Sequence, residues 1–522
     1  MNHREANLGY FFANSVARFP DKVAVIDLYG GVERLITYAM LDERADRVAG
    51  LMVRQGIGPG ERVGMIVGNR VEFLEIFLGV MRAGAIPVAI NTRLARDTLK
   101  FILEDAECRA VFVEPAAHAD ALAVAASAPL VLRIALEDAP AGWLDYASAR
   151  DASPRLVDAP ALLPDAQAFQ PYTSGSTGLP KGAIMTHAGM LWYVAYNQRY
   201  WPTEPERRGL IALPLFHKNA MRGTVKPMLY AGGSFVLMPA YEPRAYLDAL
   251  AKYRCTYSRG VAAVFTMFLQ HRDRLAELDL SALKELTIGS AVVTHELMDE
   301  VERMIPGVKV GESYGLTEGG SPFRTPLDGR AVPRGSPGVQ APEYQVRLVG
   351  ADGRDREDEG ELWLKSPYNC LGYHKRPELT RDKLVDGWLR TGDVLRRDAD
   401  GFYYFKSRVD DMFSCGGENI YPKEVEDLLF RHPAVANAVV APVPHAVKGY
   451  VPAAFVVLKR DAVADAAQIR EYCLANGPKY AHPRLVEIID EKAMPLNGAG
   501  KIDRNLARDR LAALARGGSV AG

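Results

Sequence analysis

The chain has 522 residues, of which 48% are apolar and 24% are charged, and its formal net charge is −1 at neutral pH. This composition is typical of a soluble globular protein with two to four domains. A charge so close to zero gives no support for a nucleic-acid partner or an acidic membrane surface, so we expect neither.

The cysteines and the apolar segments indicate the cellular compartment of the protein. The five cysteines are scattered, with no CxxC pair, which argues against a zinc site and for a reducing compartment. No apolar run reaches the length of a signal peptide or of a membrane span. We therefore expect a cytoplasmic protein that works on small molecules, as a monomer or a homodimer.

Strands and helices alternate through the first 290 residues. Such alternation is typical of parallel α/β units. We read residues 114–165, rich in Ala, Asp and Pro, as a peripheral helix with loops. Predicted strands cover 23–26, 63–67, 87–90, 210–213, 234–238 and 286–288, and predicted helices cover 1–20, 38–55 and 72–83.

The pattern changes twice after residue 344. Short strands joined by Gly/Asp turns cover 344–349, 360–365, 395–397 and 401–405 and indicate a small antiparallel β-barrel; the charged segment 352–361 reads as a solvated hairpin. After residue 408, a helix (424–430), two strands (438–441, 453–458) and a helix (467–475) form an α+β unit. We expect an α/β fold with a large domain, 1–409, made of α/β subdomains and this barrel, and a small α+β C-terminal domain, 410–522.

The stretch Tyr172–Gly182 reads YTSGSTGLPKG and predicts a phosphate-binding loop. Glycines let the backbone approach a ligand, successive N–H groups bind anions, and Lys181 adds a point charge. The stretch is not the P-loop of NTPases, because position 182 is Gly where that motif needs Ser or Thr. The alternative interpretation is a Ser/Gly-rich linker.

Three further polar stretches follow. Glu318 ends GESYGLTE and is a natural Mg²⁺ ligand beside phosphates; the alternative is a charge at a helix start. Asp393 ends WLRTGD on a predicted turn. Its carboxylate is a candidate for binding ribose hydroxyls; the alternative is that it only closes an Asx turn. Lys501 ends PLNGAGK, which by itself is a solvated loop lysine.

Taken together, YTSGSTGLPKG, LPLFH, YGLTE, RTGD, SRVDDM and NGAGK occur in the order and at the spacing of one family. The chain resembles the adenylate-forming superfamily of acyl-CoA synthetases, peptide-synthetase adenylation domains and firefly luciferase, over nearly its whole length. The segment 410–426 looks like the linker of the CoA ligases, and no carrier-protein domain follows. The resemblance implies an AMP-forming acid–CoA ligase, with a carboxylic acid, ATP, Mg²⁺ and coenzyme A as its small-molecule partners.

The resemblance also implies roles for individual residues. Lys501 would bridge the carboxylate and the α-phosphate, Thr317 would touch the α-phosphate, Glu318 would bind Mg²⁺ and Asp410 would be the hinge of a mobile C-terminal domain. His217 would gate the acyl pocket. The ATP site would comprise Thr173, Ser174, Gly175, Ser176, Thr177, Gly178, Lys181, Gly289, Ser290, Ala291, Glu312, Tyr314, Asp393 and Arg408. Coenzyme A would meet Arg93, Gly416, Gly417 and Lys448, although Arg93 and Lys448 also read as solvated surface cations.

The expected acyl pocket departs from the family pattern. Lys218, Arg222 and Arg259 stand where apolar residues or glycine are usual. Because cations near a buried site are unfavourable without an anionic partner, they suggest an acid with a second polar or anionic group, aromatic or short. The alternatives are that these cations pair with protein carboxylates or point to solvent, that the substrate is a fatty acid, or that the enzyme adenylates an acid and loads a carrier protein. The other expected lining residues are Tyr196, His217, Asn219, Gly319, Gly320 and Ser321.

Overall fold

The computed structural model describes residues 3–173, 179–289, 295–415, 418–445, 448–479, 481–497 and 502–517. The chain divides into two compact units, which are described separately. Unit 1 comprises Met1–Leu327, Ala341–Gln345 and Leu364–Leu389, and unit 2 comprises Asp328–Gln340, Val346–Trp363 and Arg390–Gly522. The predicted domain boundary at residue 410 stays a prediction.

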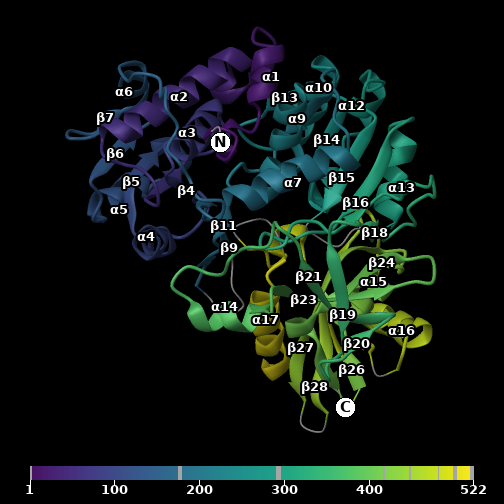
Figure 1. The fold of residues 1–522 in the computed structure, drawn as a ribbon. Coiled ribbons are helices and arrows are strands. Elements are labelled where there is room, and N and C mark those ends of the chain that lie inside the picture. Colours follow the sequence, from purple (N-terminus) through teal and green to yellow (C-terminus); the bar gives the residue numbers. More distant parts are fainter. Residues whose placement is uncertain are drawn as a thin grey trace. The chain divides into compact units, whose positions relative to one another are not determined.

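A mostly parallel sheet runs through unit 1 in the order β16-β15-β14-β12-β13-β1-β2. Figure 1 labels β13, β14, β15 and β16 of this sheet. Only β1 and β2 pair antiparallel; the other neighbours are parallel. All of β13 is buried, as expected for a strand that helices cover on both faces. The strands are β1 (Val23–Asp27), β2 (Arg34–Thr37), β12 (Arg208–Ile211), β13 (Ser234–Leu237), β14 (Tyr257–Gly260), β15 (Glu285–Gly289) and β16 (Lys309–Ser313).

A second sheet of unit 1 is parallel throughout, in the order β4-β3-β5-β6-β7. Two short antiparallel pairs, β8 with β11 and β9 with β10, follow it along the chain. The strands are β3 (Arg62–Ile66), β4 (Ile86–Ala89), β5 (Cys108–Val113), β6 (Leu132–Ala135), β7 (Leu144–Asp145), β8 (Gln167–Phe169), β9 (Tyr172–Thr173), β10 (Lys181–Gly182) and β11 (Met185–Thr186). Further short strands are β17 (Phe323–Arg324) and β22 (Leu384–Val385).

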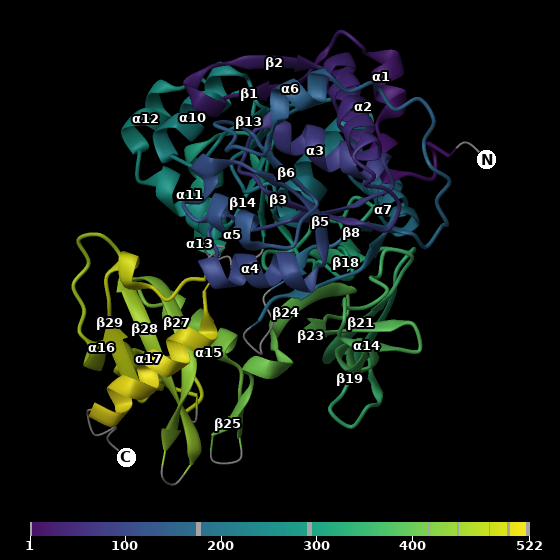
Figure 2. The same ribbon diagram turned by 90° about the vertical axis from the view of Figure 1, so that its left-hand side faces the viewer.

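The helices of unit 1 start at residues suited to that position. Thr37 caps α2 by accepting a hydrogen bond from the Met40 N–H, and Thr186 caps α7 through Gly189. α2 and α3 pack along each other (Figure 2). The longer helices are α1 (Ala13–Arg18), α2 (Tyr38–Arg54), α3 (Val71–Arg82), α4 (Arg96–Asp105), α5 (Ala121–Ser127), α6 (Tyr146–Asp151), α7 (His187–Tyr200), α9 (Lys226–Ala231), α10 (Pro243–Lys252), α11 (Ala262–Leu269), α12 (Arg272–Glu277), α13 (His295–Met304) and α14 (Pro377–Lys383). Shorter turns are η1 (Leu8–Tyr10), η2 (Tyr29–Gly31), η3 (Pro115–Ala117), α8 (Lys218–Ala220) and the π-helical η4 (Met221–Val225).

Unit 2 begins with a sheet in the order β18-β24-β23-β21-β19-β20. The pairs β18–β24, β23–β24 and β19–β20 are antiparallel, as the sequence predicts for this region. The strands are β18 (Gly338–Gln340), β19 (Gln345–Val349), β20 (Asp355–Arg356), β21 (Glu359–Lys365), β23 (Trp388–Arg397) and β24 (Phe402–Arg408), followed by the turn η5 (Val409–Asp411).

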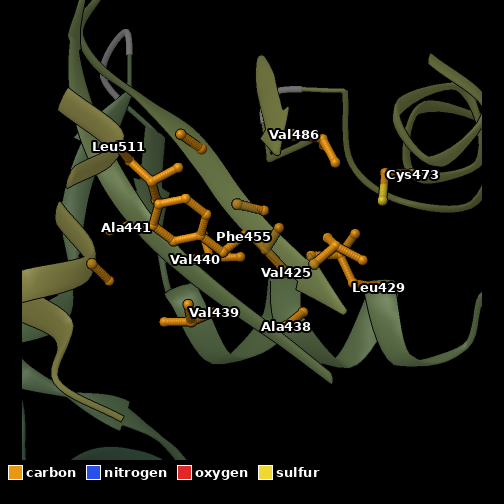
Figure 3. Packing of buried hydrophobic residues seen from close by; sticks show 14 of the residues in the cluster. Val425, Leu429, Ala438, Val439, Val440, Ala441, Phe455, Cys473, Val486 and Leu511 are labelled. Atoms are coloured by element: carbon orange, nitrogen blue, oxygen red, sulfur yellow. The ribbon is translucent and has the colours of Figure 1, made fainter. Parts of the chain in front are cut away.

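The C-terminal part of unit 2 is a small α+β structure. β27 and β28 form a long hairpin, and α15 and α17 pack against β27 (Figure 2). Phe455 and Val440 on the hairpin meet Leu429 and Leu511 on these helices in a common apolar core (Figure 3). The elements are β25 (Phe413–Cys415), β26 (Glu418–Ile420), α15 (Pro422–Phe430), β27 (Val435–His445), β28 (Gly449–Leu458), α16 (Ala466–Asn476), β29 (Leu485–Ile488), η6 (Glu491–Ala493) and α17 (Arg504–Gly517).

The predicted fold class is confirmed, with differences in detail. The predicted turn at Asp393 is wrong: this residue lies inside β23, where it pairs with Arg408 of β24. The helix predicted over 1–20 is a short 3₁₀ turn and α1, and the region 114–165 also contains β6 and β7. Within the described residues, no helix is both long and apolar enough to cross a membrane.

Candidate active site

The predicted phosphate loop is the connection of a small hairpin in unit 1. β9 and β10 pair antiparallel, so that Thr173 and Lys181 stand opposite each other at its two ends. Lys181 Nζ lies 4.8 Å from the ring centre of Tyr373. Residues 174–178, which carry the remaining predicted phosphate contacts Ser174, Gly175, Ser176, Thr177 and Gly178, lie outside the described residues.

Glu318 faces the same hairpin. Its Oε1 accepts hydrogen bonds from Thr173 Oγ1 at 3.4 Å and from the Tyr373 hydroxyl at 3.3 Å. The Cys370 N–H donates to the Glu318 carbonyl at 2.8 Å, which holds the backbone of this turn. The structure thus brings the carboxylate of YGLTE to the base of the phosphate loop, although 145 residues separate Glu318 from Thr173.

The predicted adenine contacts lie at the carboxyl ends of β15 and β16. Gly289 pairs with Ser313, and a Cβ at Gly289 would stand 2.4 Å from Ser313 Oγ, so these strand ends approach too closely for a side chain. Glu312 is on β16, and the Tyr314 ring packs on Phe323 at 5.6 Å. Ser290 and Ala291 lie outside the described residues.

The turn after Tyr314 places the three small residues of the predicted acyl pocket. Leu316 and Gly320 exchange backbone hydrogen bonds and form an isolated bridge. The backbone carbonyl of Ser321 accepts a hydrogen bond from the Tyr196 hydroxyl at 3.1 Å, while a Cβ on Gly319 would meet Leu364 and Leu389. Tyr196, Gly320 and Ser321 therefore lie together, and Gly319 turns toward a different apolar contact.

The segment after His217 is one helix with a π-helical turn in its middle. The Lys226 N–H bonds to the Met221 carbonyl, five residues earlier. Pro227 explains this irregularity, because proline has no N–H for the Gly223 carbonyl and its ring would clash with that carbonyl in a regular helix. The Gly223 carbonyl instead accepts a hydrogen bond from the Tyr257 hydroxyl at 3.3 Å. Such π-turns frequently occur at functional sites.

A small cavity of about 20 Å³ lies between this helix and the YGLTE turn. Its volume is room for about one water molecule. Thr317 lines it, which places the predicted α-phosphate contact and the predicted acyl pocket at one cavity. Its other lining residues are Phe77, Phe169, Pro171, Met185, Met190, Leu215, Phe216, Lys218, Met221, Arg222, Lys226 and Tyr368.

Arg222 is the central cation of this cavity. It is 8% exposed, its guanidinium lies 5.6 Å from the ring centre of Tyr193, and Nη1 has no hydrogen-bond partner among the described residues. A Cβ on Gly315 would stand 2.7 Å from both of its terminal nitrogens. The glycine of YGLTE therefore leaves the space that the guanidinium occupies.

Two more predicted residues lie next to this helix. Arg259, on β14, donates from Nη1 to the Asn219 amide oxygen at 3.2 Å and packs so closely over Gly223 that a Cβ there would be 2.0 Å from Nη1. His217 precedes α8, and its ring contacts Phe216 at 4.8 Å.

Lys226 is a cavity residue that the sequence reasoning missed. It is 6% exposed, and burial, reinforced by the neighbouring charge of Arg222, lowers the pKa of its ammonium group to about 7. A signal was available in the sequence, since Lys226 follows Arg222 by four residues in a helical segment and therefore shares its face.

Comparisons with known proteins agree with these motifs. A profile of AMP-binding enzymes matches residues 12–374, and one of the AMP-binding enzyme C-terminal domain matches residues 424–501. The chain belongs to the AMP-binding enzyme family. It is an AMP-forming acid–CoA ligase, which uses ATP, Mg²⁺, coenzyme A and a carboxylic acid.

The relatives of this ligase share its full length. It is 34% identical to a feruloyl-CoA synthase of Amycolatopsis sp (97% of this chain, 99% of the relative) and 31% identical to a sulfoacetate–CoA ligase of Cupriavidus necator (95% and 96%). The ATP-bound crystal structure of MatB from Rhodopseudomonas palustris matches with a TM-score of 0.87 and 30% identity, over 98% of this chain and 100% of that one.

The remaining predicted residues of the ligase lie in unit 2 or on the surface. Asp393 is 6% exposed and accepts a hydrogen bond from Arg408 Nη1 at 2.7 Å; Arg408 Nη2 is also 3.8 Å from Asp410. Arg93 is exposed, as predicted for a surface cation, while Lys448 is partly buried and its N–H donates to His445. Gly416, Gly417 and Lys501 lie outside the described residues.

Proposed function

We propose that this ligase activates an acid that carries a second anionic group, either a short or an aromatic acid, and that Arg222 and Arg259 select it. The observation that carries the proposal is the buried guanidinium of Arg222 in the cavity that Thr317 also lines. Neither arginine forms an ion pair with a carboxylate of the described residues. The alternative in which protein carboxylates neutralise them thus has no support in the described part of the chain.

The physical argument is the free energy of a buried charge. A cation removed from water is strongly unfavourable unless an anion and hydrogen bonds compensate it. Tyr193 supplies only a cation–π contact, worth about 0.5–2 kcal/mol. A substrate carboxylate or sulfonate on Arg222 Nη1 would complete the site, and the sulfoacetate–CoA ligase among the relatives is named for an acid with two such groups.

Two other substrates remain as alternatives. A fatty acid would need a long apolar channel, whereas Lys218, Arg222 and Lys226 line this cavity with cations. A carrier protein in place of coenzyme A would make AMP release depend on the holo carrier protein. An assay that varies the acid and the thiol distinguishes both alternatives from the proposal.

We assign the adenylation roles as follows. Lys181 and the phosphate loop hold the β- and γ-phosphates, and Thr317 meets the α-phosphate beside the acid. Glu318 fits Mg²⁺, because this ion takes one or two carboxylates and completes its shell with phosphates and water. Bound there, the ion would neutralise phosphate charge.

The roles in unit 2 complete the proposal. Asp393 and Arg408 hold the ribose, and Lys501 arrives on the C-terminal domain to stabilise the charge at the α-phosphate. Rotation about Asp410 then withdraws Lys501 and brings in the 415–417 loop for thioester formation. We place the reaction in the cytoplasm, since all five cysteines are free and buried and so fit a reducing compartment.

The test is AMP release with ATP and coenzyme A across matched acids. Dicarboxylates, sulfonated acids and carboxylated benzoates are compared with straight-chain fatty acids and benzoate. We expect the two-anion acids to be preferred. Arg222→Met should lower kcat/KM for them about 30- to 1,000-fold, corresponding to roughly 2–4 kcal/mol for a lost buried ion pair, and change the monoanionic acids little.

An exposed arginine provides the matched control for this test. Arg244→Met, on α10, removes a surface cation and should leave the ranking of acids unchanged. The proposal is wrong if fatty acids are turned over far better than dicarboxylates and if neither Arg222→Met nor Arg259→Leu alters that ranking.

A further inference from the structure

The helix that carries Arg222 presents another buried cation to the same cavity. Lys226 is one turn further along, and both side chains line the cavity with Thr317. Lys226 is 6% exposed, and its surroundings in the cavity are mostly Met, Phe and Leu side chains. The mechanism derived above does not use Lys226.

We infer that Arg222 and Lys226 together form the binding site of the second anionic group, and that Lys226 takes up one proton from solvent when the acid binds. This inference rests on the proposed function and assigns it a new residue. Two cations four residues apart on one helical face suit the two or three oxygens of a carboxylate or sulfonate.

The proton uptake follows from the charges around Lys226. Burial lowers the pKa of Lys226 first, and the positive charge of Arg222 lowers it further, to about 7. The helices and strands packed against this helical segment, namely α1, α7, β12, β13 and β14, carry no Asp or Glu among their residues. Their titratable side chains are Arg18, His187, Tyr193, Tyr196, Arg199, Tyr200, Arg208, Tyr257 and Arg259.

Three further groups lie across or beside the cavity. Lys218, on α8 of the same helical segment, adds another cation to its lining. Tyr368 faces it, and burial raises its pKa, so its hydroxyl is neutral. Glu318 follows Thr317 but hydrogen-bonds to Thr173 and Tyr373. An anion at Arg222 would therefore be the first negative charge next to Lys226, and it would favour the ammonium form.

The same geometry limits the size of the acid. Thr317, Arg222 and Lys226 border the same cavity, so a carboxylate that reacts beside Thr317 and a second anion on these two cations would be close together. We therefore expect short acids with two to four carbons to be favoured over carboxylated aromatic acids. Malonate, succinate and sulfoacetate are suitable probes, with butyrate and hexanoate as monoanionic controls.

The experiment measures kcat/KM for adenylation between pH 6 and pH 9, by pyrophosphate release without coenzyme A. For the two-anion probes we expect a fall of about tenfold per pH unit above pH 7, because only the protonated site binds them. Butyrate should lack this dependence. Lys226→Arg, which keeps the charge, should remove the dependence and retain the preference; Lys226→Met should lower kcat/KM at pH 6.5 at least tenfold for the two-anion probes alone.

Calorimetry supplies a readout that does not depend on turnover. Malonate or sulfoacetate bound to the full chain at pH 8, in buffers of different ionisation enthalpy, should take up about one proton in the parent protein and none in Lys226→Arg. Lys252→Met, an exposed lysine on α10, is the control and should match the parent protein.

Failures of the two proposals give different results. If two-anion acids are not preferred at any pH, the proposed function is wrong. If they are preferred but Lys226→Arg and Lys226→Met keep the pH profile and the proton uptake of the parent protein, the inference about Lys226 is wrong while the proposed function stands. The inference about Lys226 would also be wrong if a Lys226 variant kept its thermal unfolding midpoint but lost activity toward butyrate.

Discussion

Gly315 and Arg222 share one small space in unit 1. The guanidinium lies against the glycine. An ideal Cβ built on Gly315 would be only 2.7 Å from each terminal nitrogen of Arg222. The Gly320 carbonyl is 2.6 Å from the same position. A glycine of the predicted ATP-site motif is thus in close steric contact with a residue of the proposed acyl cavity.

Gly315→Ala adds one methyl group next to the Arg222 guanidinium and so tests this close contact. We expect Arg222 to be displaced, a loss of stability of about 1–3 kcal/mol from overpacking, and a fall in kcat/KM that is larger for two-anion acids than for butyrate. Gly311→Ala is the matched control, because a Cβ there meets no atom within 4 Å. Equal effects of the two substitutions on activity would contradict the expectation.

Helix α3 shows how the protein keeps charges inside a buried element. Every residue of Val71–Arg82 is buried, including two glutamates and an arginine. Glu72 lies between Arg34 and Arg70, at 2.6 Å and 2.7 Å, and Arg82 pairs with Asp46 at 2.7 Å. These ion pairs compensate the desolvation of the charges and fix how the helix packs in unit 1.

The charge of Glu72 gives a pH-dependent prediction for this element. Burial by itself would raise the pKa of Glu72, but the hydrogen bonds and charges of Arg34 and Arg70 lower it to about 2, from 4.5 in the unfolded chain. A lowered folded-state pKa stabilises the fold above pH 4.5, and this contribution disappears as the pH falls toward 2. We expect the charge of Glu72 to contribute about 3 kcal/mol to the free energy of unfolding at neutral pH.

Urea unfolding of Glu72→Gln from pH 7 to pH 2.5 measures this contribution. The variant should be less stable by roughly that amount at pH 7, and the difference should shrink below pH 4.5. Glu104→Gln, on an exposed face of α4, should change stability by less than about 0.5 kcal/mol. A difference that is independent of pH would show that the ion pairs do not stabilise the helix in this way.

The elements also show which local signals can be read from sequence. The long helix α2 and strands such as β1 and β13 were predicted to within about two residues, because their apolar pattern and caps are local. Strands β5, β14 and β16 were missed, since Arg109, Arg259 and Glu312 interrupt their patterns. Pairing with neighbouring strands, which is non-local, stabilises them.

At the scale of the whole molecule, the residues predicted to bind ATP are divided between the two units. Lys181 and Glu318 are in unit 1, Asp393 and Arg408 are in unit 2, and Lys501 follows Lys181 by 320 residues (501 − 181). A site distributed in this way can be completed for one half-reaction and altered for the next by moving one domain.

Lys501→Ala tests the division of the two half-reactions. Loss of this cation should lower acyl-adenylate formation about 100- to 1,000-fold, because it removes charge stabilisation at the α-phosphate. The variant should still convert a preformed acyl-adenylate and coenzyme A to the thioester. Lys492→Ala, an exposed lysine of η6, is the control. Normal adenylation by Lys501→Ala would show that another group stabilises this charge.

The sequence by itself determined the family and the reaction class and predicted an ATP site, because these depend on short motifs whose chemistry lies within a few neighbouring residues. The tertiary structure decided which cations line the cavity that Thr317 borders. Arg222 fits there because Gly315, ninety-three residues after it (315 − 222), leaves room for the guanidinium. Burial and pairing depend on residues far apart in the chain, so no single motif could show them.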